Sequence, residues 1–185
     1  MEEHRMSAPT IPGYITGTWD IDATHSNISF TVRHLGVSKV RGRFDEVSGS
    51  ITTGERVEDS SVTATIATAS VDTGNADRDT HIKAEDFLNA EKHESLSFTS
   101  TGIRADGEDY AIDGELTVRG VTKPVTLAAE FGGIGDGLAE GSTVIGISAR
   151  TEIKRSDFEV AANVPTGVLG DKITIELDIE ALLRK

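Results

Sequence analysis

Apolar and polar residues alternate along most of this chain, and this alternation constrains the fold more than any other feature of the sequence. Trp19, Ile21 and Ala23 form one apolar series, and the segment "NISFTVRH" places Ile28 and Phe30 on one face with polar residues between them. A period of two is typical of β-strands, because successive side chains point to opposite faces of a sheet. The sequence therefore predicts an all-β protein whose strands bury one face and expose the other.

The parity of the alternation changes at two places near the N-terminus. Ile21 and Ile28 fall on opposite parities, and so do Phe44 and Val47. A shift of one residue turns every inward side chain outward, so a chain that keeps its apolar face buried needs a corner or a bulge at such a point. We expect a corner near residues 25–27 and a bend between Phe44 and Val47.

The segment "NADRDTHIKAEDFLNAEKH" interrupts the strand pattern and is the one convincing helical piece of the sequence. Asp77 or Asp79 can cap a short helix here, with Ile82, Phe87 and Leu88 among its apolar anchors. Strand patterning resumes afterwards. It is interrupted again by a glycine-rich loop, "GGIGDGLAEGS", and by a long loop, "KRSDFEVAANVPTGVLGD".

The strand-like segments number about eight, and most are joined by short turns, which predicts an antiparallel sheet. Closing such a sheet into a barrel buries the apolar face and removes exposed edges. A two-sheet sandwich shares the same alternation and is the main alternative. We predict an all-β, eight-stranded antiparallel barrel with one short helix, formed by residues 17–185 as a single domain and preceded by a flexible arm of residues 1–16.

Net charge and cysteine content argue against several classes of function. A formal charge of −13 and a pI near 4.7 disfavour nucleic acid and anionic lipid headgroups as partners, since both are bound through clustered Lys and Arg. The chain has no cysteine, so it forms no disulfide and no thiolate metal site. Neither a signal-peptide core nor a bilayer-spanning segment is recognisable, which predicts a cytoplasmic protein without an integral membrane segment.

Small and aromatic residues share the faces that we expect to point inward. Gly42, Ala64, Gly114 and Ala129 lie on these faces beside phenylalanines. They either fit the taper of a filled barrel or leave a dry pocket for one small ligand. An eight-residue strand at ~3.3 Å per residue spans roughly 26 Å, which suits a long acyl or polyprenyl chain. Burying about twenty carbons at about 0.8 kcal/mol each gives on the order of 16 kcal/mol before the costs of association.

Several separated motifs share the pattern of one known family. They are "WDIDATHSNISFTVRHLGVSKVRGRF", "DTGNADRDTHIKAEDFLNAEKHESLSFTS", "GELTVRGVTKPVTL" and "IKRSDF". In this order, over roughly residues 18 to 180, they resemble the YceI-like, polyisoprenoid-binding family. The chain departs from the family pattern at Glu94, where proline is frequent, and at Glu159, where glycine is common. The resemblance implies a lipocalin-like barrel with an elongated apolar tunnel that binds a polyprenyl or similar long-chain amphiphile, and it allows a homodimer.

Two histidines near the N-terminus have different interpretations. His34 shares the parity of Phe30 and is expected to point inward at a barrel mouth, where it either contacts a ligand headgroup or bonds a backbone carbonyl. His25 lies at the parity change and is interpreted as structural, fixing the corner with Ser26 and Asn27. No pair of histidines has the close helical spacing that places two metal ligands on one face, so no metal site is expected.

Other candidate motifs carry little signal. Ser26 beside His25 is not thereby activated as a nucleophile, and "GGIGDGLAEG" lacks both the spacing and the helix start of a phosphate-binding loop. Several basic residues near the expected strand ends either neutralise an anionic headgroup or are ordinary solvated charges, and we favour the second interpretation. These residues are Lys39, Arg41, Arg119, Lys123, Lys154 and Arg155.

These observations predict a non-enzymatic protein that binds and carries or sequesters a polyisoprenoid or similar long-chain amphiphile, without a cofactor or a metal. The short helix, with Phe87 and Leu88, would plug or gate one end. Two alternatives stay open: an enzyme that modifies a lipid headgroup through His34, and an interaction protein with a filled barrel. The residues expected to bind the ligand are Trp19, Ile28, Phe30, Val32, His34, Phe44, Ile66, Phe87, Leu88, Phe98, Ile112, Leu116, Leu127, Phe131 and Ile147.

Overall fold

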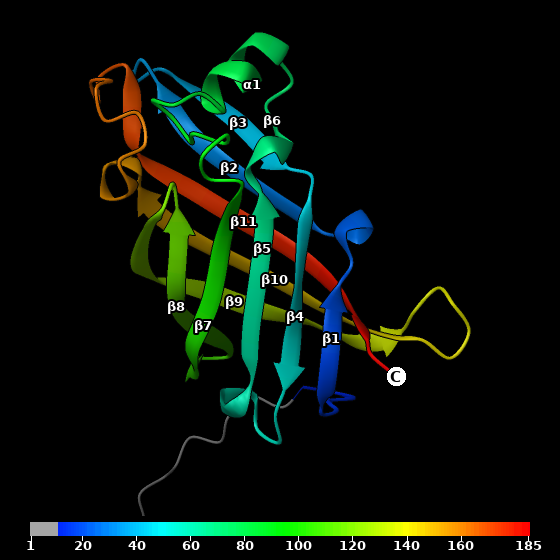
Figure 1. Ribbon diagram of the computed structural model, residues 1–185. Helices are drawn as coiled ribbons and strands as arrows, with labels where there is room; N and C mark the ends of the chain where they lie inside the picture. Colours follow the sequence, from blue (N-terminus) through cyan, green and yellow to red (C-terminus); the bar gives the residue numbers. More distant parts are fainter. Residues whose placement is uncertain (1–10) are drawn as a thin grey trace, which may run out of the picture.

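A strongly curved antiparallel sheet forms the body of the protein (Figure 1). The computed structural model describes residues 11–185, and its sheet has eleven strands. In chain order they are β1 (Gly17–Ile21), β2 (Asn27–His34), β3 (Ser38–Phe44), β4 (Val47–Thr53), β5 (Ser61–Ala67), β6 (Val71–Asp72), β7 (Ser95–Asp106), β8 (Asp109–Val118), β9 (Val121–Asp136), β10 (Thr143–Lys154) and β11 (Leu169–Leu183).

Eight of these strands close into a barrel. Neighbours follow the order β1-β4-β5-β7-β8-β9-β10-β11, and β11 also pairs with β1, which completes the ring. Each of these pairings is antiparallel. The predicted eight-stranded antiparallel barrel is confirmed, and the closed ring excludes the two-sheet sandwich. The other three strands, β2, β3 and β6, extend the sheet from β11 towards one end of the barrel.

Strand β11 changes partner along its length. Its residues 169–178 pair with β2, and residues 181–183 pair with β1. Strands β1 and β2 are therefore two halves of one bent strand, joined by the 3-10 turn η1 (Ala23–His25). A second break separates the end of β3 from the start of β4. Both breaks fall where the parity of the sequence changes, so the bend keeps the apolar side chains of both halves facing inward.

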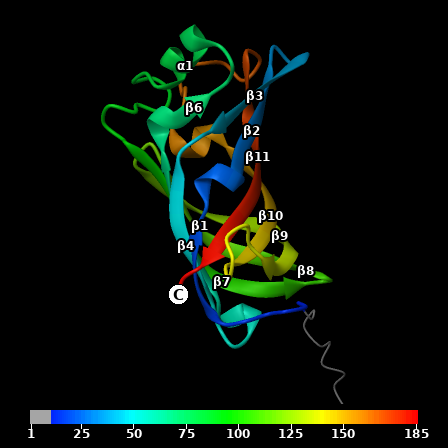
Figure 2. The same cartoon turned by 90° about the vertical axis from the view of Figure 1, so that its right-hand side faces the viewer.

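Helix α1 (Ala76–Ile82) lies at the same end of the barrel as the turn between β2 and β3 (Figures 1 and 2). Its N-cap is Asn75, whose side chain accepts a hydrogen bond from the backbone N–H of Arg78 (2.9 Å). The prediction that Asp77 or Asp79 caps the helix is wrong, because both residues lie within its first turn. Asn75 has the extended backbone conformation that a capping residue needs.

The helix ends before two of the residues predicted to anchor it. Phe87 and Leu88 follow α1 in a series of turns, and the N–H of Leu88 donates to the carbonyl of Ile82 (3.0 Å). Leu88 is buried and Phe87 is half-buried, so both still cover the barrel from outside the helix. No helix within residues 11–185 is long and apolar enough to cross a membrane.

The described part of the predicted N-terminal arm is docked on the barrel. Residues 1–10 lie outside the residues that the structure describes. Ile11 and Tyr14 pack against the core, and the Tyr14 hydroxyl donates a hydrogen bond to the carbonyl of Gly54 (2.6 Å). Residues 11–16 therefore belong to the packed domain.

Candidate functional site

The barrel contains an apolar cavity of about 530 Å³. This volume lies within the range of about 300–1,000 Å³ that is typical of small-molecule sites. The most exposed residues of its wall are His34, Arg78, His81 and Val168. They come from the end of β2, from α1 and from the segment before β11, so the cavity opens at the end of the barrel that carries α1. We call this the open end.

The opposite end of the barrel, which we call the closed end, is filled by side chains. Trp19, Ile145 and Ala181 have no exposed surface, and none of them lines the cavity. They come from the adjacent strands β1, β10 and β11, and Ile145 lies directly opposite Ala181 in the sheet. The Trp19 indole N–H donates to Oγ1 of the buried Thr53 (3.0 Å), which fixes the ring in place.

Most of the residues predicted to bind the ligand face the cavity, and two do not. Trp19 fills the closed end, and Phe131 of β9 packs edge-on against Tyr110, with 5.5 Å between ring centroids. Both predictions are corrected, because alternation determines which way a side chain points and not its depth along the barrel. The residues that line the cavity are Ile28, Phe30, Val32, His34, Phe44, Ile66, Phe87, Leu88, Phe98, Ile112, Leu116, Leu127 and Ile147. That they bind a ligand remains a prediction.

The cavity wall also contains residues that the sequence analysis did not select. The loop before β11 contributes Val164 and Val168, which have no periodic signal because their backbone is irregular. The inward face of β11 follows the strict alternation, so the same rule could have found it. Its residues in the wall are Leu169, Ile173, Ile175, Leu177 and Ile179.

Two of the small residues on the inward faces, Gly42 and Gly114, seat aromatic rings. A Cβ on Gly42 would collide with the ring of Phe30, and one on Gly114 would collide with the ring of Phe98. Each ring therefore packs against the backbone of a glycine on the neighbouring strand, a pairing that stabilises glycine within a sheet. Of the small residues considered, Ala64 does line the cavity.

Arg155, at the start of the 3-10 turn η4 (Arg155–Phe158), is buried in the cavity wall with 3% of its surface exposed. The prediction that it is an ordinary solvated charge is wrong. Its five N–H donors are directed at backbone carbonyls of the loop between η4 and β11 and of the first two residues of β11, so the guanidinium holds this loop against the barrel. The acceptors are the carbonyls of Gly170 (3.0 Å), Val160 (3.2 Å), Ala161 (2.6 Å), Val164 (2.8 Å) and Leu169 (2.8 Å).

Three polar side chains stand around the open end. Arg78 donates to Oγ1 and to the carbonyl of Thr73 (2.8 and 2.7 Å). The His81 ring packs edge-on against Phe87, with 4.7 Å between ring centroids. His34 is exposed at the end of β2, and its ring forms no hydrogen bond with any residue between 11 and 185. The bond to a backbone carbonyl, one of the two interpretations of His34, is therefore not observed among these residues.

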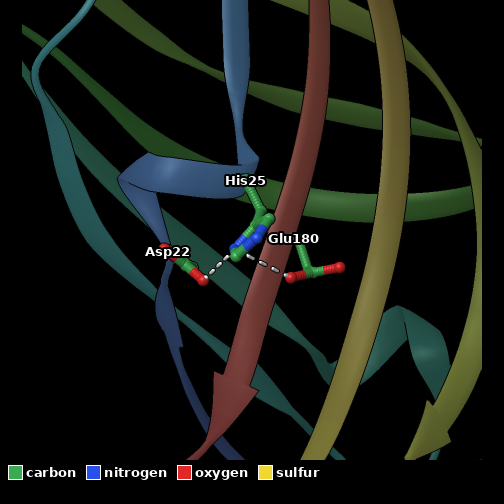
Figure 3. Close-up of side chains that lie close together, drawn as sticks. All are labelled: Asp22, His25 and Glu180. Carbon is green, nitrogen blue, oxygen red and sulfur yellow. Dashed lines mark hydrogen bonds and ion pairs between the residues drawn. The ribbon is translucent and has the colours of Figure 1, made fainter. Parts of the chain in front are cut away.

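His25 lies at the corner between β1 and β2, with the carboxylates of Asp22 and Glu180 close to its ring (Figure 3). Its Nδ1 is 2.7 Å from Asp22 Oδ2 and 3.6 Å from Glu180 Oε2. The hydrogen bond with Asp22 raises the pKa of His25 and lowers the pKa of Asp22. Within residues 11–185 these groups are also the set of potential metal ligands, with ligand atoms within 4.8 Å of one another. Both carboxylates face the same ring nitrogen, so the arrangement is that of an ion pair across the corner.

Comparisons with known proteins agree with this architecture. Residues 19–181 match the model of the YceI-like domain family. Protein YceI of Escherichia coli is 37% identical over 167 residues, which cover 90% of this chain and 86% of that protein. The crystal structure of a Campylobacter jejuni YceI protein has a TM-score of 0.74 at 35% identity and covers 83% of this chain and 90% of that one. A polyisoprenoid-binding domain of Saccharophagus degradans, implicated in plant cell wall breakdown, shares the fold with a TM-score of 0.66 at 18% identity, over 92% of this chain and 100% of that domain.

Proposed function

The chain belongs to the YceI-like domain family, as its sequence motifs predict, and from this premise we propose that it binds a polyisoprenoid or similar long-chain amphiphile inside the barrel. The observation that carries the proposal is the cavity of about 530 Å³, whose wall is almost entirely apolar. The description of the Saccharophagus domain as polyisoprenoid-binding supports the same class of ligand. The protein would carry or sequester this ligand.

The two ends of the barrel give the ligand one favourable orientation. An apolar chain gains about 0.8 kcal/mol for each methylene that it buries. A polar headgroup would lose its hydrogen bonds among the isoleucines and phenylalanines of the interior. The headgroup therefore belongs at the open end, where His34, Arg78 and His81 provide hydrogen-bonding groups. The chain would extend from there towards Trp19.

The alternatives have less support. An interaction protein with a filled barrel requires side chains to close the interior throughout, whereas only the closed end is filled in this way. An enzyme acting through His34 would need a group that orients or activates the imidazole. No carboxylate within residues 11–185 forms an ion pair with the His34 ring. We therefore propose a binding role without catalysis and without a cofactor.

The proposal is tested by extracting the purified protein with organic solvent and identifying what is released by mass spectrometry. Protein loaded with a long-chain isoprenoid should release close to one molecule per chain. Replacing the cavity residue Leu116 with Trp should fill part of the cavity and reduce recovery by about tenfold or more, because an overfilled interior cannot accommodate the chain. Ile175→Phe, on β11 and separated from β8 by two strands, gives an independent second variant.

The matched control is Glu115→Trp, which places the same indole on the outer face of the same strand. It should bind as the parent does. Equal recovery from Leu116→Trp, Ile175→Phe and Glu115→Trp would contradict the proposal, as would a parent protein that stays empty after exposure to candidate lipids. The absence of catalysis is checked with the same samples: the bound molecule should be chemically unchanged, and His34→Ala should still bind it. Conversion of the molecule by the parent and not by His34→Ala would support the enzyme instead.

A further inference from the structure

Strands β2 and β3 with their turn form a hairpin of positive charge, which we call the basic hairpin (residues 27–44). It contains Arg33, Lys39, Arg41 and Arg43 and no acidic residue, although the whole chain has 31 Asp and Glu against 18 Lys and Arg. The negative net charge of the chain therefore does not disfavour anionic lipid headgroups at this part of the surface. The hairpin lies outside the closed ring of strands and borders the open end (Figure 2).

The positions of the cations destabilise the basic hairpin itself. Arg33 lies directly opposite Lys39 in the antiparallel pair, and Arg41 is the next outward residue along β3. Like charges in opposite positions on a sheet destabilise it. Arg43 is neutralised by Asp45 and Asp72, whereas Lys39 and Arg41 form no ion pair with any residue from 11 to 185. A surface that gathers uncompensated cations in this way is suited to an anionic partner.

The tip of the basic hairpin is apolar and exposed. Val37 is 84% exposed and Leu35 is 55% exposed. Leu35 has φ = 54°, a left-handed conformation that leucine rarely adopts, and it presents its side chain beyond the last strand residues. The N–H of Leu35 donates to the carbonyl of Val168 (2.9 Å), and Val168 is itself 42% exposed and part of the cavity wall. The apolar tip thus lies beside the entrance of the cavity.

We propose that the basic hairpin is the surface through which the protein docks on an anionic lipid bilayer. Lys39, Arg41 and Arg33 would contact the headgroups, and Leu35 and Val37 would enter the boundary between headgroups and acyl chains. The other side of the open end carries the exposed acidic residues Asp77, Glu85 and Asp86, and would face away from the bilayer. Docking in this way rests on the proposed function and would give the ligand a route of entry, since an apolar chain could pass from the bilayer to the cavity along Val168.

The charge of the whole protein does not prevent such docking. Interactions between exposed charges are screened beyond about 10 Å at 0.1 M salt, so a bilayer in contact with the hairpin senses the local cations far more than distant acidic residues. The attraction should weaken as salt is raised, and binding should be reversible because the apolar tip is small.

Cosedimentation of the full chain with vesicles tests the proposal. We expect binding to vesicles of phosphatidylcholine mixed with phosphatidylglycerol, and much weaker binding to phosphatidylcholine alone or at high salt. The double variant Lys39→Glu/Arg41→Glu should reduce the partition coefficient by at least about tenfold, since each cation near an anionic surface contributes several-fold to binding. Val37→Asp should reduce it by a smaller factor, and the 84% exposure of Val37 makes an effect on folding negligible.

Matched controls lie away from the basic hairpin. Arg56→Glu reverses a charge that is already paired with Glu58, and Leu138→Asp alters a side chain that is 94% exposed in the loop between β9 and β10. Both should bind as the parent does. Failure of the parent to bind anionic vesicles, or equal losses in control and hairpin variants, would overturn the proposal. So would hairpin variants that alter only the mass measured by light scattering, since the hairpin would then contact a second copy of the chain.

The same protein samples separate this inference from the proposed function. Each variant is also extracted, and its bound lipid is measured by mass spectrometry. A parent that holds a long chain but ignores anionic vesicles refutes the docking surface and leaves the binding function in place. A parent that binds vesicles through the hairpin but holds no chain refutes the binding function and leaves the docking surface in place.

Discussion

The two ends of this barrel are built from the same alternating strands, but side chains fill one end and the other end contains a cavity. At the closed end Trp19, Ile145 and Ala181 interlock with no exposed surface. At the open end, inward residues of the same kind, such as Phe30 and Ile173, face a cavity. The difference is not explained by the size of the side chains alone, because an isoleucine stands at each end, Ile145 in the filled part and Ile173 in the cavity wall.

What separates the two ends is the partner of β11. Where β11 pairs with β1, the ring is complete and the facing strands approach closely enough to interdigitate. Where it pairs with β2, the sheet continues into β3 and β6 instead of closing. The open end is then covered by α1, by the turns after it, and by the loop that Arg155 holds. The pairing of β11 therefore determines how far the cavity extends along the barrel, and the irregular segments at the open end form its entrance.

The largest test of this comparison is to remove one aromatic side chain from each end. Trp19→Ala should lower the free energy of unfolding by about 3–5 kcal/mol, because it leaves a void in close-packed surroundings and removes the hydrogen bond to Thr53. Phe87→Ala, in the half-buried cover of the open end, should lower it by about 1 kcal/mol. Urea unfolding followed by circular dichroism measures both. Equal losses would mean that the closed end is not the more tightly packed region.

A second test concerns the cover of the open end alone. Arg155→Met keeps the length of the side chain but leaves five carbonyls without their donor, so we expect a loss of about 2–3 kcal/mol. Hydrogen exchange should rise in residues 159–170 and stay low in β1 and β10. The control is Lys154→Met, an exposed neighbour. If Arg155→Met were no more destabilising than Lys154→Met, the guanidinium would not be what holds the loop.

The sequence predicts the barrel because apolar and polar residues alternate along its strands. Alternation identifies the strands and their buried face, and the two parity changes coincide with the breaks between β1 and β2 and between β3 and β4. The same rule falls short at "GGIGDGLAEGS", where β9 continues to Asp136 as a strand paired with β10. The glycines in this segment are typical of a loop, but a strand in a sheet needs only backbone hydrogen bonds, which glycine also forms.

Periodicity does not predict how far along the barrel a side chain lies, and it does not predict irregular structure. Trp19 and Phe131 point inward as predicted but lie at the closed end, a distinction that requires knowing where β11 changes partner. Three of the acceptors of Arg155 lie in a loop without repeating pattern and two lie at the start of β11, so its burial has no local signal. One position there is different: Glu159, where the family commonly has glycine, has φ = 58°, the left-handed conformation that glycine favours. The glycine of the family pattern therefore marks this left-handed backbone position in the sequence.

The smallest test concerns the corner at which the two ends meet. Glu180 lies on β11 between the residues that pair with β2 and those that pair with β1, so the contacts of His25 with Asp22 and Glu180 clamp the point where β11 changes partner. The hydrogen bond with Asp22 raises the pKa of His25, so its contribution to stability is fully present below the unfolded-state pKa near 6.5 and is lost as pH rises through the higher folded-state pKa. His25→Gln should therefore be more destabilising at about pH 6 than at about pH 9. Urea unfolding of His25→Gln, Asp22→Asn and the double variant measures the coupling, and Asn at position 22 still offers an oxygen to the backbone N–H of Thr24. Losses that add without coupling, or that do not depend on pH, would mean that backbone pairing alone fixes the corner and the depth of the cavity behind it.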